Sequence, residues 1–137
     1  MKTSSLKLNV SESIGSVSAE VMTSAKPKAI LTLAHGAGAG MNHPFMIALS
    51  NELAVLDVGT LRFNFPFTEQ KKGRPDVPAV AHKTIEVAIQ KALELFPKTS
   101  IYCGGKSFGG RMTSQLFAKQ EIKDINGIVF VGFPLHP

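Results

Sequence analysis

A serine flanked by glycines is the feature of this 137-residue sequence that most directly indicates chemistry. The run Gly105-Lys-Ser-Phe-Gly109 places small residues two positions before and two positions after Ser107. In a G-x-S-x-G pattern between a strand and a helix, the small residues permit a sharp, strained turn that raises the serine hydroxyl above the sheet. Residues 100–104 have the character of a buried strand and residues 108–119 that of a helix, so we predict that Ser107 is a nucleophile.

The same turn orients the backbone of the residue that follows Ser107. The N–H of Phe108, at the expected start of the helix, would face the oxyanion that forms when a serine adds to a carbonyl carbon. Two other interpretations of a glycine-rich turn remain open from the pattern alone: close packing without any chemistry, and phosphate binding at the helix N-terminus.

A second glycine-rich loop, His35-Gly-Ala-Gly-Ala-Gly40, follows the predicted strand 29–34. A loop in that position can turn a backbone N–H toward the serine, and we assign this second oxyanion donor to Ala37, with Gly36 supporting the turn. His35 fits either of two roles, an anchor that holds the loop through hydrogen bonds or a catalytic base, and we favour the anchor.

The glycines of this loop also invite comparison with a dinucleotide-binding fingerprint. Their spacing is G-x-G-x-G, whereas the fingerprint requires G-x-G-x-x-G. The next predicted strand ends in Asn64, Phe65 and Pro66 and so lacks the acidic residue that would bind a ribose. A dinucleotide site is therefore disfavoured, and we expect no cofactor.

The elements that carry these loops follow from hydrophobic periodicity and from the positions of glycine and proline. We expect residues 67–77 to be a surface loop, because they contain Gly73, Pro75 and several charges. The order of elements predicts one α/β domain over residues 1–137, a mostly parallel sheet with helices on both faces and an N-terminal antiparallel hairpin. The hairpin covers 6–10 and 17–21, the parallel strands are 29–34, 59–65, 100–104 and 127–131, and the helices are 44–56, 78–96 and 108–119.

Composition narrows the class of protein further. Hydrophobic residues make up 44% and charged residues 18%, which is typical of a globular domain. The net charge of +5 is scattered and there is no Trp, so we expect no nucleic-acid partner. Without a long apolar run or a cleavable leader, we expect a cytoplasmic protein with no membrane contact. The single cysteine, Cys103, excludes an intramolecular disulfide, and no spacing of ligand residues indicates a metal.

Two histidines outside the glycine-rich loops have structural explanations. His43 precedes Pro44 and is expected to cap the helix that begins there. His82 lies beside Lys83, and we expect it to be solvated on the polar face of its helix.

Taken together and in this order, the two loops resemble those of the α/β-hydrolases. The motifs that carry the likeness are His35-Gly-Ala-Gly with Asn42-His-Pro, Arg62-Phe-Asn-Phe, Gly104-Gly-Lys-Ser-Phe-Gly-Gly-Arg111 and Gly132-Phe-Pro-Leu-His-Pro137. They are similar to a small lidless, dienelactone-hydrolase-like branch that includes the testis-expressed and NSL-complex-subunit homologues. The resemblance implies a serine hydrolase that cleaves an ester or related acyl bond of a small molecule, with the N–H groups of Phe108 and Ala37 as its oxyanion hole.

The resemblance also implies strands beyond residues 132–137, which carry the acid and the histidine of the catalytic triad. We therefore expect a truncated domain that lacks its C-terminal strands. Within the sequence, His136 is the remaining candidate base, because it follows the last strand at the edge where Ser107 should lie. Asp76 and Asp124 lie in loops, and a Ser–Lys pair with Lys106 is disfavoured because adjacent side chains on a sharp turn point apart.

The missing triad members leave a second class of function open, a hydrolase scaffold that binds a partner or an acyl ligand without catalysis. The predicted strand over residues 125–130 should lie at the edge of the sheet, and it is apolar with no lysine or proline inside it. Such an edge tends to pair with another strand. We therefore expect a homodimer formed through this edge or by covering exposed helix faces.

Overall fold

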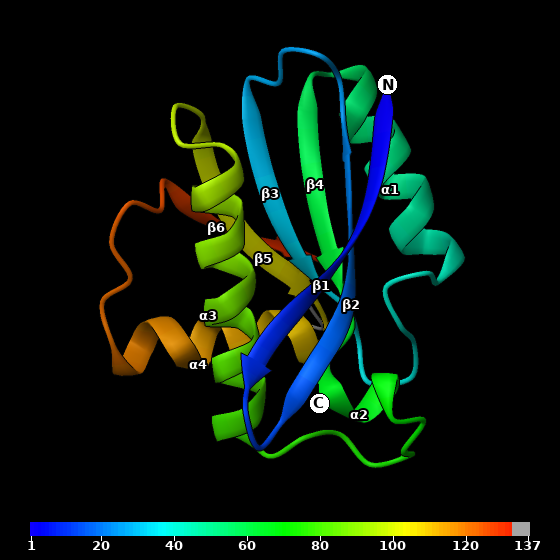
Figure 1. Ribbon diagram of the computed structural model, residues 1–137, viewed down its shortest axis with the longest axis vertical. Helices are drawn as coiled ribbons and strands as arrows, with labels where there is room; N and C mark the ends of the chain where they lie inside the picture. The colour runs from blue at the N-terminus through cyan, green and yellow to red at the C-terminus, as the bar shows by residue number, and fades with distance from the viewer. Residues whose placement is uncertain (133–137) are drawn as a thin grey trace.

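The computed structural model describes residues 1–132, which form a six-stranded sheet flanked by helices (Figure 1). Across the sheet the strands run in the order β1-β2-β4-β3-β5-β6. The α/β fold predicted from the sequence is confirmed, including the N-terminal hairpin. In chain order the elements are β1 (Lys2–Ser11), β2 (Gly15–Thr23), β3 (Ala29–Ala34), α1 (Pro44–Val55), β4 (Val58–Phe63), α2 (Pro66–Glu69), α3 (Pro78–Leu95), β5 (Ser100–Lys106), α4 (Phe108–Lys119) and β6 (Gly127–Val131).

The parallel part of the sheet sets where chemistry can occur. β4, β3, β5 and β6 run parallel to one another, whereas β2 joins β4 in antiparallel pairing and extends the sheet to β1. The connections from β3 to β4, from β4 to β5 and from β5 to β6 each pass through a helix, as parallel strands require. The carboxyl ends of β3, β4 and β5 therefore meet at one edge (Figure 1), the edge at which open α/β sheets bind ligands.

Helices cover both faces of the sheet, as predicted. α3 and α4 pack over one face and enclose the larger apolar core, whereas α1 packs over the other. β3 serves both layers, because Ile30 and Ala34 belong to the larger core while Leu31 and Leu33 contact Met46 of α1. This alternation is the period of two that a strand buried on both faces shows.

The expectation that residues 67–77 form a surface loop is partly wrong. Pro66 begins the short helix α2, and Phe67 within it is only 2% exposed. The N–H of Phe67 donates to Asp76 Oδ2 at 3.1 Å, so the far end of the segment folds back onto its start. The expectation rested on Gly73 and on the charges, and it overlooked that a proline at the first position favours a helical turn.

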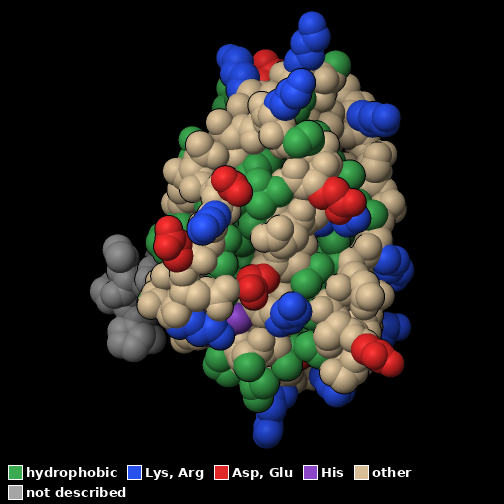
Figure 2. Space-filling view, turned by 60° about the vertical axis from the view of Figure 1, so that its left-hand side comes forward, with side chains coloured by type: hydrophobic (Ala, Val, Ile, Leu, Met, Phe, Trp, Pro, Cys, Tyr) green, Lys and Arg blue, Asp and Glu red, His purple; other side chains and the backbone are tan. Residues whose placement is uncertain are grey.

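The expectation for His82 is also wrong, because this side chain is buried between α3 and α4. Its Nε2 lies 3.1 Å from Oε1 of Gln115, which links the two helices. Viewed from the side of these helices, acidic and basic side chains are interspersed over the surface rather than gathered into a basic stripe (Figure 2).

β6 lies at one edge of the described sheet, as expected, and β1 lies at the other. Ile128 and Val129 are each 37% exposed, although both belong to a strand. None of the helices formed by residues 1–132 has the length and apolar character needed to cross a membrane.

Candidate active site

The backbone of Ser107 has the conformation of a strained turn between β5 and α4. Its φ of +55° and ψ of −114° lie in a region that residues with a Cβ rarely adopt. The side chain makes no hydrogen bond to cap α4, although a serine at that position ordinarily would. The hydroxyl is therefore not used by the helix, and the conformation matches the turn that a nucleophilic serine requires.

Glycine is required at positions 105 and 109 because the backbone of β3 lies too close for a side chain, and not because either residue has a positive φ. A Cβ on Gly105 would lie 2.7 Å from the carbonyl oxygen of Ala34, and one on Gly109 would lie 2.6 Å from the same oxygen. Ala34 is the last residue of β3 and pairs with Gly105 in the parallel register. The turn at Ser107 is therefore packed directly against the end of β3, the point from which the loop 35–40 leaves the sheet.

The loop that follows β3 lies against Ser107. A Cβ on Gly36 would be 3.5 Å from the Cβ of Ser107, so the two backbones are in close proximity. Within residues 1–132 the N–H of Ala37 donates to no hydrogen bond. Phe108 is the first residue of α4, where N–H groups have no partner inside the helix. Two backbone donors are thus available beside the serine.

His35 is held between two backbone groups and is completely buried. Its Nε2 lies 3.0 Å from the N–H of Phe65 and accepts that hydrogen bond, so the proton must be on Nδ1. Nδ1 then donates to the carbonyl oxygen of Gly36 at 2.7 Å. Burial lowers the pKa of His35 and keeps the ring neutral, against the smaller opposing effect of the Gly36 carbonyl. With both nitrogens occupied, the geometry supports the anchoring role rather than that of a base.

A small cavity of about 250 Å³ opens at the serine. His43 at its wall accepts a hydrogen bond from the N–H of Phe45 through Nδ1, at 3.2 Å, so its predicted capping of α1 is confirmed. Met46 of α1 forms part of the same wall. The residues that line the cavity are Gly36, Ala37, Gly38, Ala39, His43, Met46, Lys106 and Ser107.

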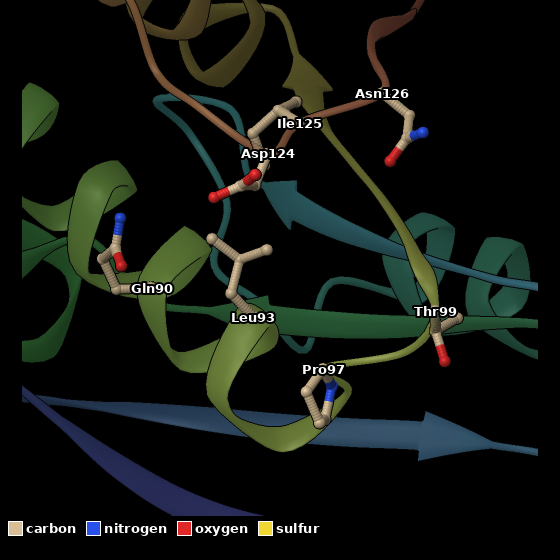
Figure 3. A pocket seen from close by; sticks show the side chains of 7 residues that line it. All are labelled: Gln90, Leu93, Pro97, Thr99, Asp124, Ile125 and Asn126. Carbon is tan, nitrogen blue, oxygen red and sulfur yellow. The ribbon is translucent and has the colours of Figure 1, made fainter.

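A larger hollow, of about 650 Å³, lies at the amino ends of the parallel strands, away from Ser107 (Figure 3). It is lined by the C-terminal part of α3 and by the segments that lead into β5 and β6, so it faces the amino ends of those strands. Asp124 points toward it from the loop before β6. Because Ser107 is at the carboxyl end of β5, this hollow cannot serve the serine, and it places Asp124 at the wrong edge for a triad.

The other candidates for proton transfer are not placed beside Ser107, or fall beyond the described residues. His136 lies outside residues 1–132. Asp76 is engaged by the N–H of Phe67, and burial raises the pKa of its carboxyl. The Nζ of Lys106 lies 5.3 Å from the centre of the Phe45 ring, and no hydrogen bond joins it to Ser107.

Cys103 is fully enclosed in β5. Burial raises the pKa of its thiol to about 12, so it is unreactive near neutral pH. The described part of the chain also contains no group of three or more His, Cys, Asp or Glu side chains arranged to hold a metal ion.

A buried arginine supports the glycine-rich loop, and the sequence reasoning missed its role. Arg62 of β4 is 1% exposed and donates to the carbonyl oxygen of Met41 at 2.6 Å, to Asn42 Oδ1 at 3.2 Å and to Glu20. The N–H of Met41 in turn donates to Asn64 Oδ1 at 2.9 Å. The end of the loop is therefore fixed to the sheet, and the signal that could have indicated it is a charged residue inside an apolar strand.

Comparison with protein families assigns this fold to a class. A family model described as an alpha/beta hydrolase domain matches residues 27–137, and the chain belongs to this family. The family assignment agrees with the turn at Ser107 and with the adjacent glycine-rich loop. The narrower testis-expressed and NSL-complex-subunit branch stays a prediction.

Solved structures of hydrolases share the fold at low sequence identity. A dienelactone hydrolase from Anabaena variabilis matches with a TM-score of 0.78 and 14% identity, over 94% of this chain and 62% of that one. An α/β serine hydrolase without a lid from Xanthomonas campestris gives 0.79 and 17%, over 98% and 62%. An α/β serine hydrolase homologue from Coxiella burnetii gives 0.78 and 18%, over 98% and 65%. The chain thus spans less than two thirds of the length of these proteins.

Proposed function

We propose that the protein is a serine hydrolase that cleaves an ester or a related acyl bond. Ser107 Oγ forms a bond to the acyl carbon, the bond from that carbon to the leaving group breaks, and the oxyanion is held by the N–H groups of Phe108 and Ala37. Water then cleaves the acyl-enzyme and restores the serine. The observation that carries this proposal is the positive φ of Ser107 next to the backbone of Gly36.

The proton of Ser107 must pass to a base and then to the leaving group. We propose His136 for this role, or else a histidine that is not among these 137 residues. His35 is not proposed, because both of its ring nitrogens already make hydrogen bonds. Without a base the two amides alone would still support weak catalysis.

A fluorophosphonate probe and p-nitrophenyl acetate test the proposal on the 137-residue chain. We expect labelling that is lost in Ser107→Ala. Loss in His136→Ala as well would assign the base to His136, whereas labelling that persists in His136→Ala would place the base elsewhere. No labelling of the unaltered chain would overturn the hydrolase proposal for these residues.

One observation favours a second candidate, a binding module that retains the hydrolase scaffold. Among residues 1–132 no histidine or carboxylate forms a hydrogen bond with Ser107. A module of this kind would bind an acyl ligand in the 250 Å³ cavity without turning it over. Binding of a p-nitrophenyl ester with neither labelling nor release of p-nitrophenol would support it.

We further propose that two copies associate through β6. This strand is one of the two edge strands of the described sheet, with Ile128 and Val129 each 37% exposed. An apolar edge strand without an internal lysine or proline readily pairs with another strand.

A further inference from the structure

The ammonium group of Lys106 lies at the wall of the cavity that holds the nucleophile. Lys106 is the last residue of β5, immediately before Ser107, and both residues line the 250 Å³ space. Its Nζ lies 5.3 Å from the ring centre of Phe45, a partly exposed residue in the first turn of α1. The long side chain therefore spans from the sheet to α1 along the cavity.

Among residues 1–132 no acidic side chain pairs with this ammonium group. None of the residues lining the cavity is an aspartate or a glutamate, and no ion pair within residues 1–132 includes Lys106. A second hollow on the other side of the glycine-rich loop shares Ala37, Gly38 and Ala39 with the first and is lined by Lys71 and Lys72. Asp76 attracts Lys72 from nearby, and Lys106 is the lysine that lines the same cavity as Ser107.

His43 adds a second donor to the same wall. Its Nδ1 accepts a hydrogen bond from the N–H of Phe45, so its proton is on Nε2. An N–H donor and an ammonium therefore line the cavity together, without any carboxylate among its lining residues. This combination suits a ligand that brings its own negative charge.

Burial of the ammonium decides between neutral and anionic substrates. A neutral acyl chain in the cavity would remove water from Lys106 and offer no counter-charge, which is unfavourable. A carboxylate would replace that water with a charge-assisted hydrogen bond, and the cation–π contact with Phe45 is weak enough at an exposed site to permit it. The cavity is smaller than the usual drug-sized pocket, so the chain that carries the charge must be short.

We propose that the cavity selects an ester whose acyl group carries a carboxylate a few carbons from the scissile carbonyl, and that Lys106 recognises this carboxylate. The proposal rests on the serine hydrolase function proposed above. It assigns Lys106 to substrate selection, and the acyl transfer itself remains with Ser107 and the two amides.

Binding to a chain that cannot turn over tests the proposal directly. Mono-p-nitrophenyl glutarate, which carries the charge, and neutral p-nitrophenyl pentanoate are titrated against Ser107→Ala. We expect Ser107→Ala/Lys106→Met to bind the glutarate ester about tenfold more weakly, with the pentanoate ester unchanged. Ser107→Ala/Lys98→Met is the matched control, because Lys98 is exposed at the opposite edge of the sheet and should leave both affinities unchanged.

Equal loss of both esters, or loss of neither, in the Lys106→Met chain would overturn the proposal. Ser107→Ala/Lys106→Arg, which keeps the charge, should bind the glutarate ester more tightly than the Met variant and guards against a folding defect. Fluorophosphonate labelling tests the serine hydrolase function separately from the role of Lys106, because that probe is uncharged. Charge-selective binding without labelling would overturn the hydrolase function alone, and labelling without charge selection would overturn the role of Lys106 alone.

Discussion

At the scale of single residues, Ser107 is held in a conformation that its own chemistry disfavours. A non-glycine residue with positive φ costs about 1–3 kcal/mol and persists only where the surrounding structure determines it. Here the determinants are the backbone contacts of Gly105 and Gly109 with Ala34. The strain therefore supports a functional reason for a serine at this position, since a glycine would adopt the same φ without cost.

His35 and His82 make stability depend on pH. Burial lowers the pKa of both, so below about pH 6.5 the unfolded chain binds protons that the folded chain does not. The free energy of unfolding should therefore fall as the pH drops from about 7 to 5. Urea titrations at several pH values in this range measure the free energy of unfolding, and its change with pH should be smaller in His35→Gln and in His82→Gln than in the unaltered chain. An unchanged slope in the double variant would contradict the assignment.

Arg62 is expected to be a large contributor to the stability of the site. Arg62→Met removes the donors to Met41, Asn42 and Glu20, and breaking a buried pair costs about 3 kcal/mol. Chemical denaturation should show this loss, together with slower fluorophosphonate labelling because the glycine-rich loop is released. Arg74→Met, at an exposed position, should change the free energy of unfolding by less than about 0.5 kcal/mol. A small effect of Arg62→Met would show that the loop is held by other contacts.

At the scale of elements, the site depends on the close packing of α4 against the ends of the paired strands β3 and β5. Gly109 lets α4 approach the end of β3 so closely that an added Cβ would overlap Ala34. Gly109→Ala should therefore lower the free energy of unfolding by about 1–3 kcal/mol through overpacking. Thermal unfolding measures this, with Gly73→Ala as the control, because a Cβ there meets nothing within 4 Å. Equal melting temperatures for the two variants would contradict the close packing of α4 against the end of β3.

The elements that the sequence predicted well are those with strong periodicity or clear punctuation. The strand before Ser107 and the helix after it were predictable because glycines, apolar runs and four-residue spacing coincide there. α2 was not predictable in the same way, because a single turn has no period and Phe67 is buried by tertiary contacts. A charged residue inside an apolar strand marks Arg62 as unusual, but its partners were unpredictable, since Met41 and Glu20 come from distant parts of the chain.

At the scale of the whole molecule, the sequence predicted which loops come together and left open what completes them. Parallel pairing of β3 with β5 brings the loop after one and the turn after the other to the same edge, so the nearness of Gly36 and Ser107 followed from topology. The catalytic base for Ser107 could not be identified in the same way, because His136 lies outside the described residues and no local sequence pattern identifies a proton acceptor.

Association through β6 is a prediction about the whole molecule. Light scattering at micromolar concentration should give the mass of a dimer. Val129→Lys places a charge on the edge strand and should shift the mass toward the monomer, as lysines on natural edge strands do. Val55→Lys is the matched control, because Val55 is exposed on α1 and should leave the mass unchanged. A monomer in the unaltered chain would contradict the proposed association.

The nucleophile is the central claim, and mass spectrometry of the fluorophosphonate-treated chain tests it most directly. Peptide mapping should find a single adduct, on Ser107, in the unaltered chain and in Ser114→Ala, which changes an exposed serine of α4. The adduct should be absent from Ser107→Ala. An adduct on another residue, or none on Ser107 after prolonged treatment, would contradict the account.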